Sequence, residues 1–196
     1  MGLTIAASMA MAQTPDYANI GRRPSQEDMQ AWDIAIGTEG KELPPGKGTA
    51  KEGEAVYARK CAVCHGADLN GAHIPGSPVG SPKRPLIGGM DKIRTPEPVR
   101  TVGAFWPFAT TVWDYIYRAM PFGQEGSLTP AEVYSVTAFI LYKNGIIQEN
   151  DVLDAKSLPK VKMPNRDGFL PARFEDIADL QKRGCRLGQC PESNSK

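Results

Sequence analysis

Apolar residues recur at helical spacing in three stretches between residues 49 and 148, and each stretch follows a helix-start signal. The first signal is Thr-Ala-Lys-Glu at 49–52, a capping box in which a hydroxyl and a carboxylate satisfy early backbone N–H groups. It predicts a helix that runs into Cys61. Another box at 129–132, with Pro130 in the favoured first position, predicts a helix that ends at the Asn-Gly of 144–145.

The middle stretch opens with Thr-Val-Trp-Asp at 111–114, which repeats the box with aspartate in the acidic position. Val112, Ile116 and Ala119 then share one apolar face. Because proline disfavours helical geometry in the residue before it, we expect this helix to end near Ala119, just ahead of Pro121.

These signals predict an all-α domain over residues 49–148, in which the first and third helices cross closely at Gly53. An N-terminal arm at 13–48 and a C-terminal arm at 149–196 flank it, and an alternating run at 32–36 suggests a short strand in the first arm. Both arms carry large apolar side chains that are costly to leave in water, so we expect them to dock on the domain and on a larger protein. These side chains are Trp32, Ile34, Leu43, Val161, Met163, Phe169, Leu170 and Phe174.

Composition narrows the class of protein. The chain has 196 residues, a formal net charge of +1 and 41% hydrophobic residues. This charge gives no bulk electrostatic basis for binding nucleic acid, and no apolar run reaches the roughly 18 residues typical of a membrane span. Residues 1–12 end in Ala-Met-Ala and resemble the end of a secretory signal, which predicts export to the periplasm. A frayed apolar N-terminus is the alternative.

The strongest chemical signal is Cys61-Ala62-Val63-Cys64-His65, the C-x-x-C-H pattern of covalent haem c attachment. Cys61 and Cys64 would form thioethers with the haem vinyl groups, and His65 would bind the iron. A zinc site would need a second C-x-x-C, and a thioredoxin-like dithiol would need a βαβ context. The sequence therefore predicts one covalently bound haem c.

The other two cysteines, Cys185 and Cys190, are separated by a short segment that contains Gly188. In an oxidising compartment this spacing favours a small disulfide. Two free thiols are the alternative.

A second iron ligand is expected on the opposite face of the haem, and Met120 is the best candidate. Pro121 forces the chain out of the helix at that point, and a thioether is a soft, flexible ligand. Met90 is the next candidate, Met163 and His73 remain less favoured, and a gap-filling role is the alternative for Met120.

Aromatic residues between the haem motif and Met120 are candidates to line the haem pocket, with Trp106 and Tyr115 named first. The haem propionates need counter-charges or hydrogen bonds if they are buried. Arg84, Arg94 and Arg100 are candidates for this role, although each of them is also a plausible surface charge.

Together these residues resemble a class I cytochrome c, which implies three main helices around one haem, with extended N- and C-terminal arms. Several further strings are similar to the cytochrome subunit of bacterial Sox-type sulfane dehydrogenases. They are GRRP at 21–24, AWDI at 31–34, LPPG at 43–46, TTVWDYI at 110–116, RAMPF at 118–122 and KMPNRDGF at 162–169. The chain departs from family members that carry a second haem domain, because it has a single C-x-x-C-H.

This resemblance implies a monohaem electron-transfer subunit rather than a catalytic one. Its expected donor is a molybdopterin-containing sulfur dehydrogenase subunit, and its expected acceptor is a protein such as a small cytochrome c. Three alternatives stay open: the cytochrome subunit of a sulfite dehydrogenase, a haem enzyme that acts directly on a sulfur compound, and a binding module with a structural haem.

Overall fold

A computed structural model describes residues 20–72, 76, 83–93, 95 and 99–169. The chain divides into two compact units, one ending at Ile34 and the other beginning at Ala35. The predicted signal segment 1–12, His73, and the cysteines at 185 and 190 lie outside the described residues. None of the helices in the described ranges is long and apolar enough to cross a bilayer.

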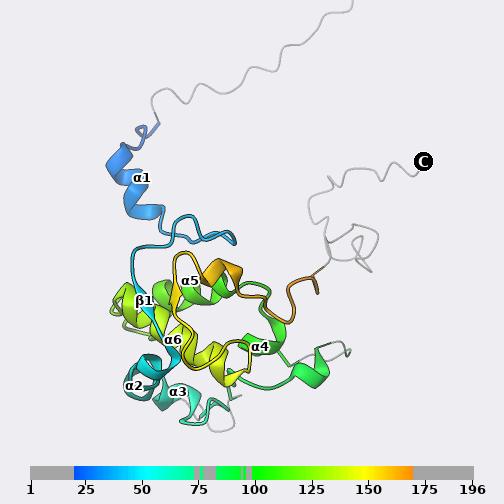
Figure 1. Cartoon of the computed structure of the whole chain (residues 1–196). Coiled ribbons are helices and arrows are strands. Elements are labelled where there is room, and N and C mark those ends of the chain that lie inside the picture. The colour runs from blue at the N-terminus through cyan, green and yellow to red at the C-terminus, as the bar shows by residue number, and fades with distance from the viewer. Residues whose placement is uncertain (1–19, 73–75, 77–82, 94, 96–98, 170–196) are drawn as a thin grey trace, which may run out of the picture. The chain divides into compact units, whose positions relative to one another are not determined.

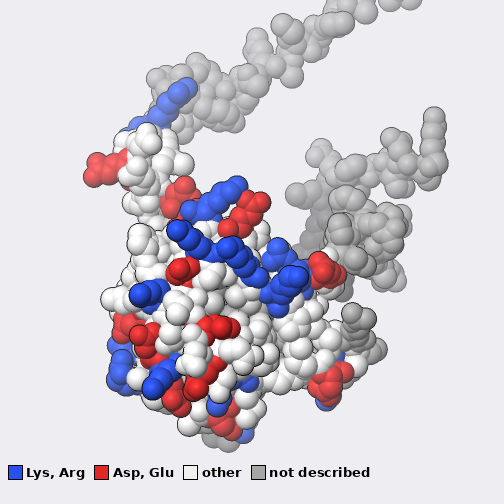
Figure 2. All heavy atoms as spheres, in the orientation of Figure 1, with Lys and Arg blue, Asp and Glu red and all other residues white. Residues whose placement is uncertain are grey.

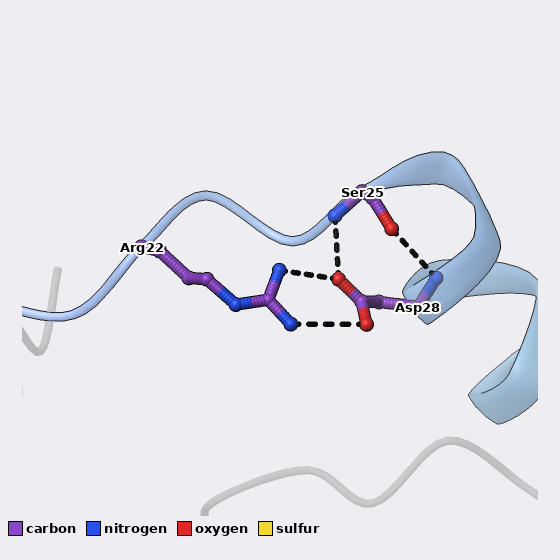
Figure 3. A network of polar contacts seen from close by, with 3 residues as sticks. All are labelled: Arg22, Ser25 and Asp28. Atoms are coloured by element: carbon purple, nitrogen blue, oxygen red, sulfur yellow. Dashed lines mark hydrogen bonds and ion pairs between the residues drawn. The ribbon is translucent and has the colours of Figure 1, made fainter.

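The first unit contains one short helix, α1 (Gln26–Trp32), which is stabilised at its start by its own side chains. The Ser25 hydroxyl accepts from the Asp28 N–H, and the Asp28 carboxylate accepts from the Ser25 N–H at 2.8 Å. Arg22 donates two hydrogen bonds to the same carboxylate (Figure 3). These bonds, led by the one from Arg22, lower the pKa of Asp28.

This helix corrects the strand expected at 32–36. Trp32 is the last residue of α1, and residues 33–36 form no strand. The alternation of apolar residues was misleading because Ser25 and Asp28 form a capping box, and that box starts a helix seven residues before the run. The box is readable in the sequence, so this error was avoidable.

The second unit is built on the crossing of α2 (Ala50–Lys60) and α6 (Pro130–Lys143), both of which begin at the predicted capping boxes. A Cβ atom added to Gly53 would lie 1.9 Å from the Ser135 carbonyl oxygen, so only glycine permits this approach. The rings of Tyr57 and Phe139 meet beside it, with centroids 5.2 Å apart. The close crossing at Gly53 is confirmed.

The remaining elements of the second unit are one further long helix, α5, and several short helices and strands (Figure 1). They are β1 (Lys47–Gly48), α3 (Ala62–His65), η1 (Met90–Lys92), α4 (Val102–Phe105), α5 (Ala109–Ala119), β2 (Leu153–Asp154) and η2 (Leu158–Lys160). Strands β1 and β2 pair antiparallel, with Lys47 opposite Asp154 and Gly48 opposite Leu153. The described fold is helical, as the sequence predicted.

Helix α5 ends where it was expected but begins earlier. Met120 follows its last residue with extended backbone, φ −129° and ψ 148°, in agreement with the effect of Pro121. Its first residue is Ala109, however, and the predicted capping box at 111–114 is wrong. Asp114 does not bond back to the helix start because it is occupied by the Ile36 N–H and by Arg118.

Parts of both arms pack into the second unit. The Ile36 N–H donates to Asp114 at 2.9 Å, and the Tyr134 hydroxyl donates to the Pro44 carbonyl at 3.0 Å. From the C-terminal arm, Leu158 and Met163 are fully buried in the core. For these described portions, docking of the arms on the helical domain is confirmed, whereas Trp32 and Ile34, which were also expected to dock, are exposed.

Candidate functional site

The attachment segment is the single helical turn that follows α2. The Cys61 N–H donates to the Tyr57 carbonyl at 2.9 Å, and the His65 N–H donates to the Cys61 carbonyl at 2.9 Å. Residues three apart on a helical turn lie on the same side, so the turn presents Cys61 and Cys64 together. Both side chains are half-buried.

The chemistry of the Cys61 thiol argues against a reactive dithiol at this motif. Burial, together with the neighbouring Cys64, raises the pKa of the Cys61 thiol to about 11. A thiol that stays protonated is a poor redox nucleophile, which disfavours a reactive dithiol. Among the described residues no group of three or more His, Cys, Asp or Glu side chains is arranged to hold a metal ion.

The His65 imidazole is oriented by a backbone carbonyl. Its Nδ1 lies 3.1 Å from the Arg84 carbonyl oxygen, which can only accept, so Nδ1 carries the proton in this contact. The lone pair of Nε2 then stays available for a metal, and such a carbonyl partner is typical of the shell around a ligating histidine.

Gly71 brings this carbonyl to the histidine. Its φ is +81°, and a Cβ atom there would lie 2.7 Å from the Arg84 nitrogen. Its N–H also donates to the His65 carbonyl at 2.8 Å. Sequence reasoning missed Gly71 because the contact depends on two loops whose approach no local pattern indicates.

Met120 lies at the edge of the core. Its side chain is half-buried and packs on the main hydrophobic cluster, whereas Met163 is buried inside that cluster and Met90 is 42% exposed. A ligand to a bound group must contact that group while still packing against protein. Of these three methionines, Met120 fits that requirement best.

Several half-buried apolar side chains pack on the hydrophobic core and keep part of their surface accessible. Trp106 meets Tyr115 edge to face, with ring centroids 5.5 Å apart. Members of this set pack on the core on one side only and include Cys61, Leu86, Ile87, Trp106, Tyr117 and Met120. A flat apolar cofactor would remove their remaining surface from water.

The donor set therefore fits haem c: two thiols on one turn, an imidazole nitrogen with a free lone pair and a thioether. A buried indole nitrogen, Trp113 Nε1, has no hydrogen-bond partner within the protein, so it is available to a bound carboxylate or a water. The candidate arginines are not drawn together. Arg100 lies over the Phe105 ring, Arg84 is exposed and Arg94 lies outside the described residues.

Comparison with known proteins shows which family this chain is similar to. The family described as cytochrome c oxidase, cbb3-type, subunit III matches residues 48–140. A thiosulfate dehydrogenase of Stutzerimonas stutzeri (strain A1501) is 32% identical over 97 residues, which cover 50% of this chain and 28% of that protein. The chain thus spans little more than a quarter of this curated relative.

A solved structure matches over a much longer stretch. A chain of the sulfane dehydrogenase SoxCD from Paracoccus pantotrophus is 33% identical, with a TM-score of 0.69, and the match covers 91% of this chain and 82% of that one. The same helical arrangement therefore recurs in a related protein, and the match extends into the arms. The chain belongs to the cytochrome c family, in the group that includes this sulfane dehydrogenase chain, and its cofactor is covalently bound haem c.

Proposed function

We propose that this protein is a monohaem electron-transfer subunit that accepts electrons from a molybdopterin-containing sulfur dehydrogenase subunit and passes them to a small cytochrome c. The observation that carries the proposal is the match to a SoxCD chain over 91% of this chain. Residues 48–140 are less than half of the sequence, so the arms contribute to the likeness. The cytochrome domain is common to many proteins, so we expect the arms to determine which partner this protein binds.

In this proposal Cys61 and Cys64 hold the cofactor, and His65 and Met120 are its axial ligands. Haem c supplies a one-electron iron couple when it is bound, and a His/Met pair favours a raised potential, which suits an electron acceptor. The Arg84 carbonyl keeps the His65 ring in one orientation. The hydrophobic core packs against one side of the Met120 side chain and so limits its exposure to water.

The site of action in this proposal is the periplasm. Covalent haem c and the signal-like residues 1–12 both support export, and the sulfur-oxidising relatives are consistent with it. Cys185 and Cys190 would form a disulfide there.

A second candidate function is direct oxidation of thiosulfate at the haem. It is favoured by the 32% identity to a thiosulfate dehydrogenase, which lies within half of this chain. A catalytic haem needs an open or displaceable distal position. Met120, if it ligates the iron, closes that position.

The decisive experiment combines the holoprotein with its molybdenum-containing partner under anaerobic conditions. Haem reduction is followed after addition of sulfite, thiosulfate or a carrier-bound persulfide. We expect reduction by the persulfide only when the partner is present. Reduction by thiosulfate without the partner would establish the catalytic alternative, and reduction by sulfite with the partner would assign the protein to a sulfite dehydrogenase.

A further inference from the structure

A basic segment in the C-terminal arm stands out against an otherwise balanced chain. The whole sequence has 23 basic and 22 acidic residues. Residues 156–166 nevertheless contain no carboxylate, and they carry the exposed cations Lys156, Lys160, Lys162 and Arg166. Figure 2 shows blue side chains gathered over the region where Figure 1 draws this segment in orange.

The basic segment, residues 156–166, is held firmly on the second unit. Leu158 and Met163 are buried, with exposed fractions of 0% and 2%. The Asn165 amide donates to the Phe105 carbonyl at 2.8 Å. The Arg166 guanidinium lies 4.3 Å from the centre of the Phe108 ring. Buried anchors thus alternate with exposed cations, so the positive charge has a fixed place.

These anchors hold the basic segment near Trp106, a candidate residue of the haem pocket. Its two partners, Phe105 and Phe108, are chain neighbours of Trp106, whose ring meets Tyr115. The segment also borders a cavity of about 460 Å³ that is lined by residues 159–164, Arg166 and Asp167. A protein that docks on the cations would therefore lie next to Trp106 and Tyr115, the candidate aromatic residues of the haem pocket.

The charges of the segment are available to a partner. Three described cations, Arg22, Lys41 and Arg118, are each paired with a carboxylate of the chain. Within the described residues, none of the four cations of the basic segment makes an ion pair with a carboxylate. Exposed, unneutralised charge at a fixed place raises association rates by steering an oppositely charged partner.

We propose that the basic segment docks the acidic surface of the soluble redox protein that takes electrons from this subunit. This inference rests on the proposed electron-transfer function and specifies the partner's charge and where it binds. Exposed lysines favour fast association and fast release, which suits a transient acceptor more than a permanent subunit. The formal net charge of the whole chain is only +1. This small charge gives no reason to prefer nucleic acid or a lipid surface as the partner over an acidic redox protein.

The test uses the full-length holoprotein with a small c-type cytochrome of net negative charge as oxidant. The variant Lys160→Glu/Lys162→Glu is compared with Lys47→Glu/Lys51→Glu, which changes the net charge equally on β1 and α2. At low ionic strength we expect the second-order oxidation rate to fall about tenfold in the first variant only, because steering typically contributes factors of 10 to 1,000. High salt should remove the difference, while haem spectrum and potential stay unchanged.

Carbodiimide cross-linking supplies a readout that is independent of rate. Amide links from the acidic cytochrome should map to Lys156, Lys160 or Lys162 rather than to Lys47 or Lys51. Equal rates in the two variants, or cross-links spread over all lysines, would overturn the proposal. So would a charge-dependent loss of binding to phosphatidylglycerol vesicles or to an oligonucleotide without any change in oxidation rate. If the molybdenum partner fails to reduce the haem but the rate and cross-link effects persist, the proposed donor is wrong and the docking site stands.

Discussion

The two sides of the candidate site are built in different ways. On the attachment side Cys61, Cys64 and His65 lie within one helical turn, held by backbone bonds to nearby residues. Met120, the proposed second ligand, lies at the end of α5, and its position depends on how α5 packs on the core. The attachment residues are therefore specified by a local motif, whereas the position of the proposed second ligand is specified by the tertiary fold.

Loss of the attachment thiols should have the largest effect. In Cys61→Ala/Cys64→Ala both thioethers are impossible, so all haem should become extractable with acidified organic solvent. Intact-mass spectrometry of wild type should show one haem that resists the same extraction. If the double variant retains covalent haem, the motif is not the attachment site.

Substitution of the distal candidate should change the redox properties and leave attachment intact. In Met120→Ala we expect the sulfur-to-iron charge-transfer band to disappear and the potential to fall by on the order of 0.1 V, a part of the roughly 0.8 V range that axial ligands span. Voltammetry and absorption spectra measure both. Met90→Ala is the matched control, and the assignment fails if the control loses the band instead.

The helix crossing beneath the attachment turn should be intolerant of a side chain. Gly53→Ala places a Cβ against the Ser135 carbonyl, and overpacking of this kind costs about 1–3 kcal/mol or more. Denaturant unfolding of the holoprotein should show the loss, whereas Ala55→Ser on the exposed face of α2 should stay near wild type. Unchanged stability in Gly53→Ala would mean that the helices are less closely packed.

The smallest effect concerns Asp114, which ties the N-terminal arm to α5. Burial alone would raise its pKa, but hydrogen bonds from Arg118 and the Ile36 N–H, with the charge of Arg118, lower it below the usual value. The native state thus favours the carboxylate, so its contribution is present above the unfolded pKa and is lost as pH falls through the lower native pKa.

In Asp114→Asn we expect a loss of about 1–2 kcal/mol at neutral pH, because a hydrogen bond to a charged group is weakened and half-exposed Arg118 remains screened by water. The difference from wild type should shrink towards acid pH in urea titrations. A constant difference from neutral to acid pH would show that charge is not involved.

Local signals predicted α2 and α6 well, because each begins at a capping box and α6 ends before Gly145. The start of α5 was missed, since Asp114 bonds to Ile36, which is distant in sequence. The pairing of β1 with β2 and the burial of Leu158 were not predicted, because the weak periodicity of the C-terminal arm does not indicate them. Docking of Met163 was expected from its size and apolar character alone.

These contacts also limit what deletion of the C-terminal arm can show. Deleting residues 149–196 would remove β2, Leu158 and Met163 from the second unit, so it would disturb the core as well as any docking role of the arm.

The central claim is a haem held by one histidine and one methionine, and X-ray absorption at the iron edge tests it most directly. The account predicts one sulfur atom in the first coordination shell of the wild-type holoprotein. That sulfur should be absent in Met120→Ala and retained in Met90→Ala. A wild-type spectrum with nitrogen or oxygen ligands only, or a sulfur that persists in Met120→Ala, would contradict the account.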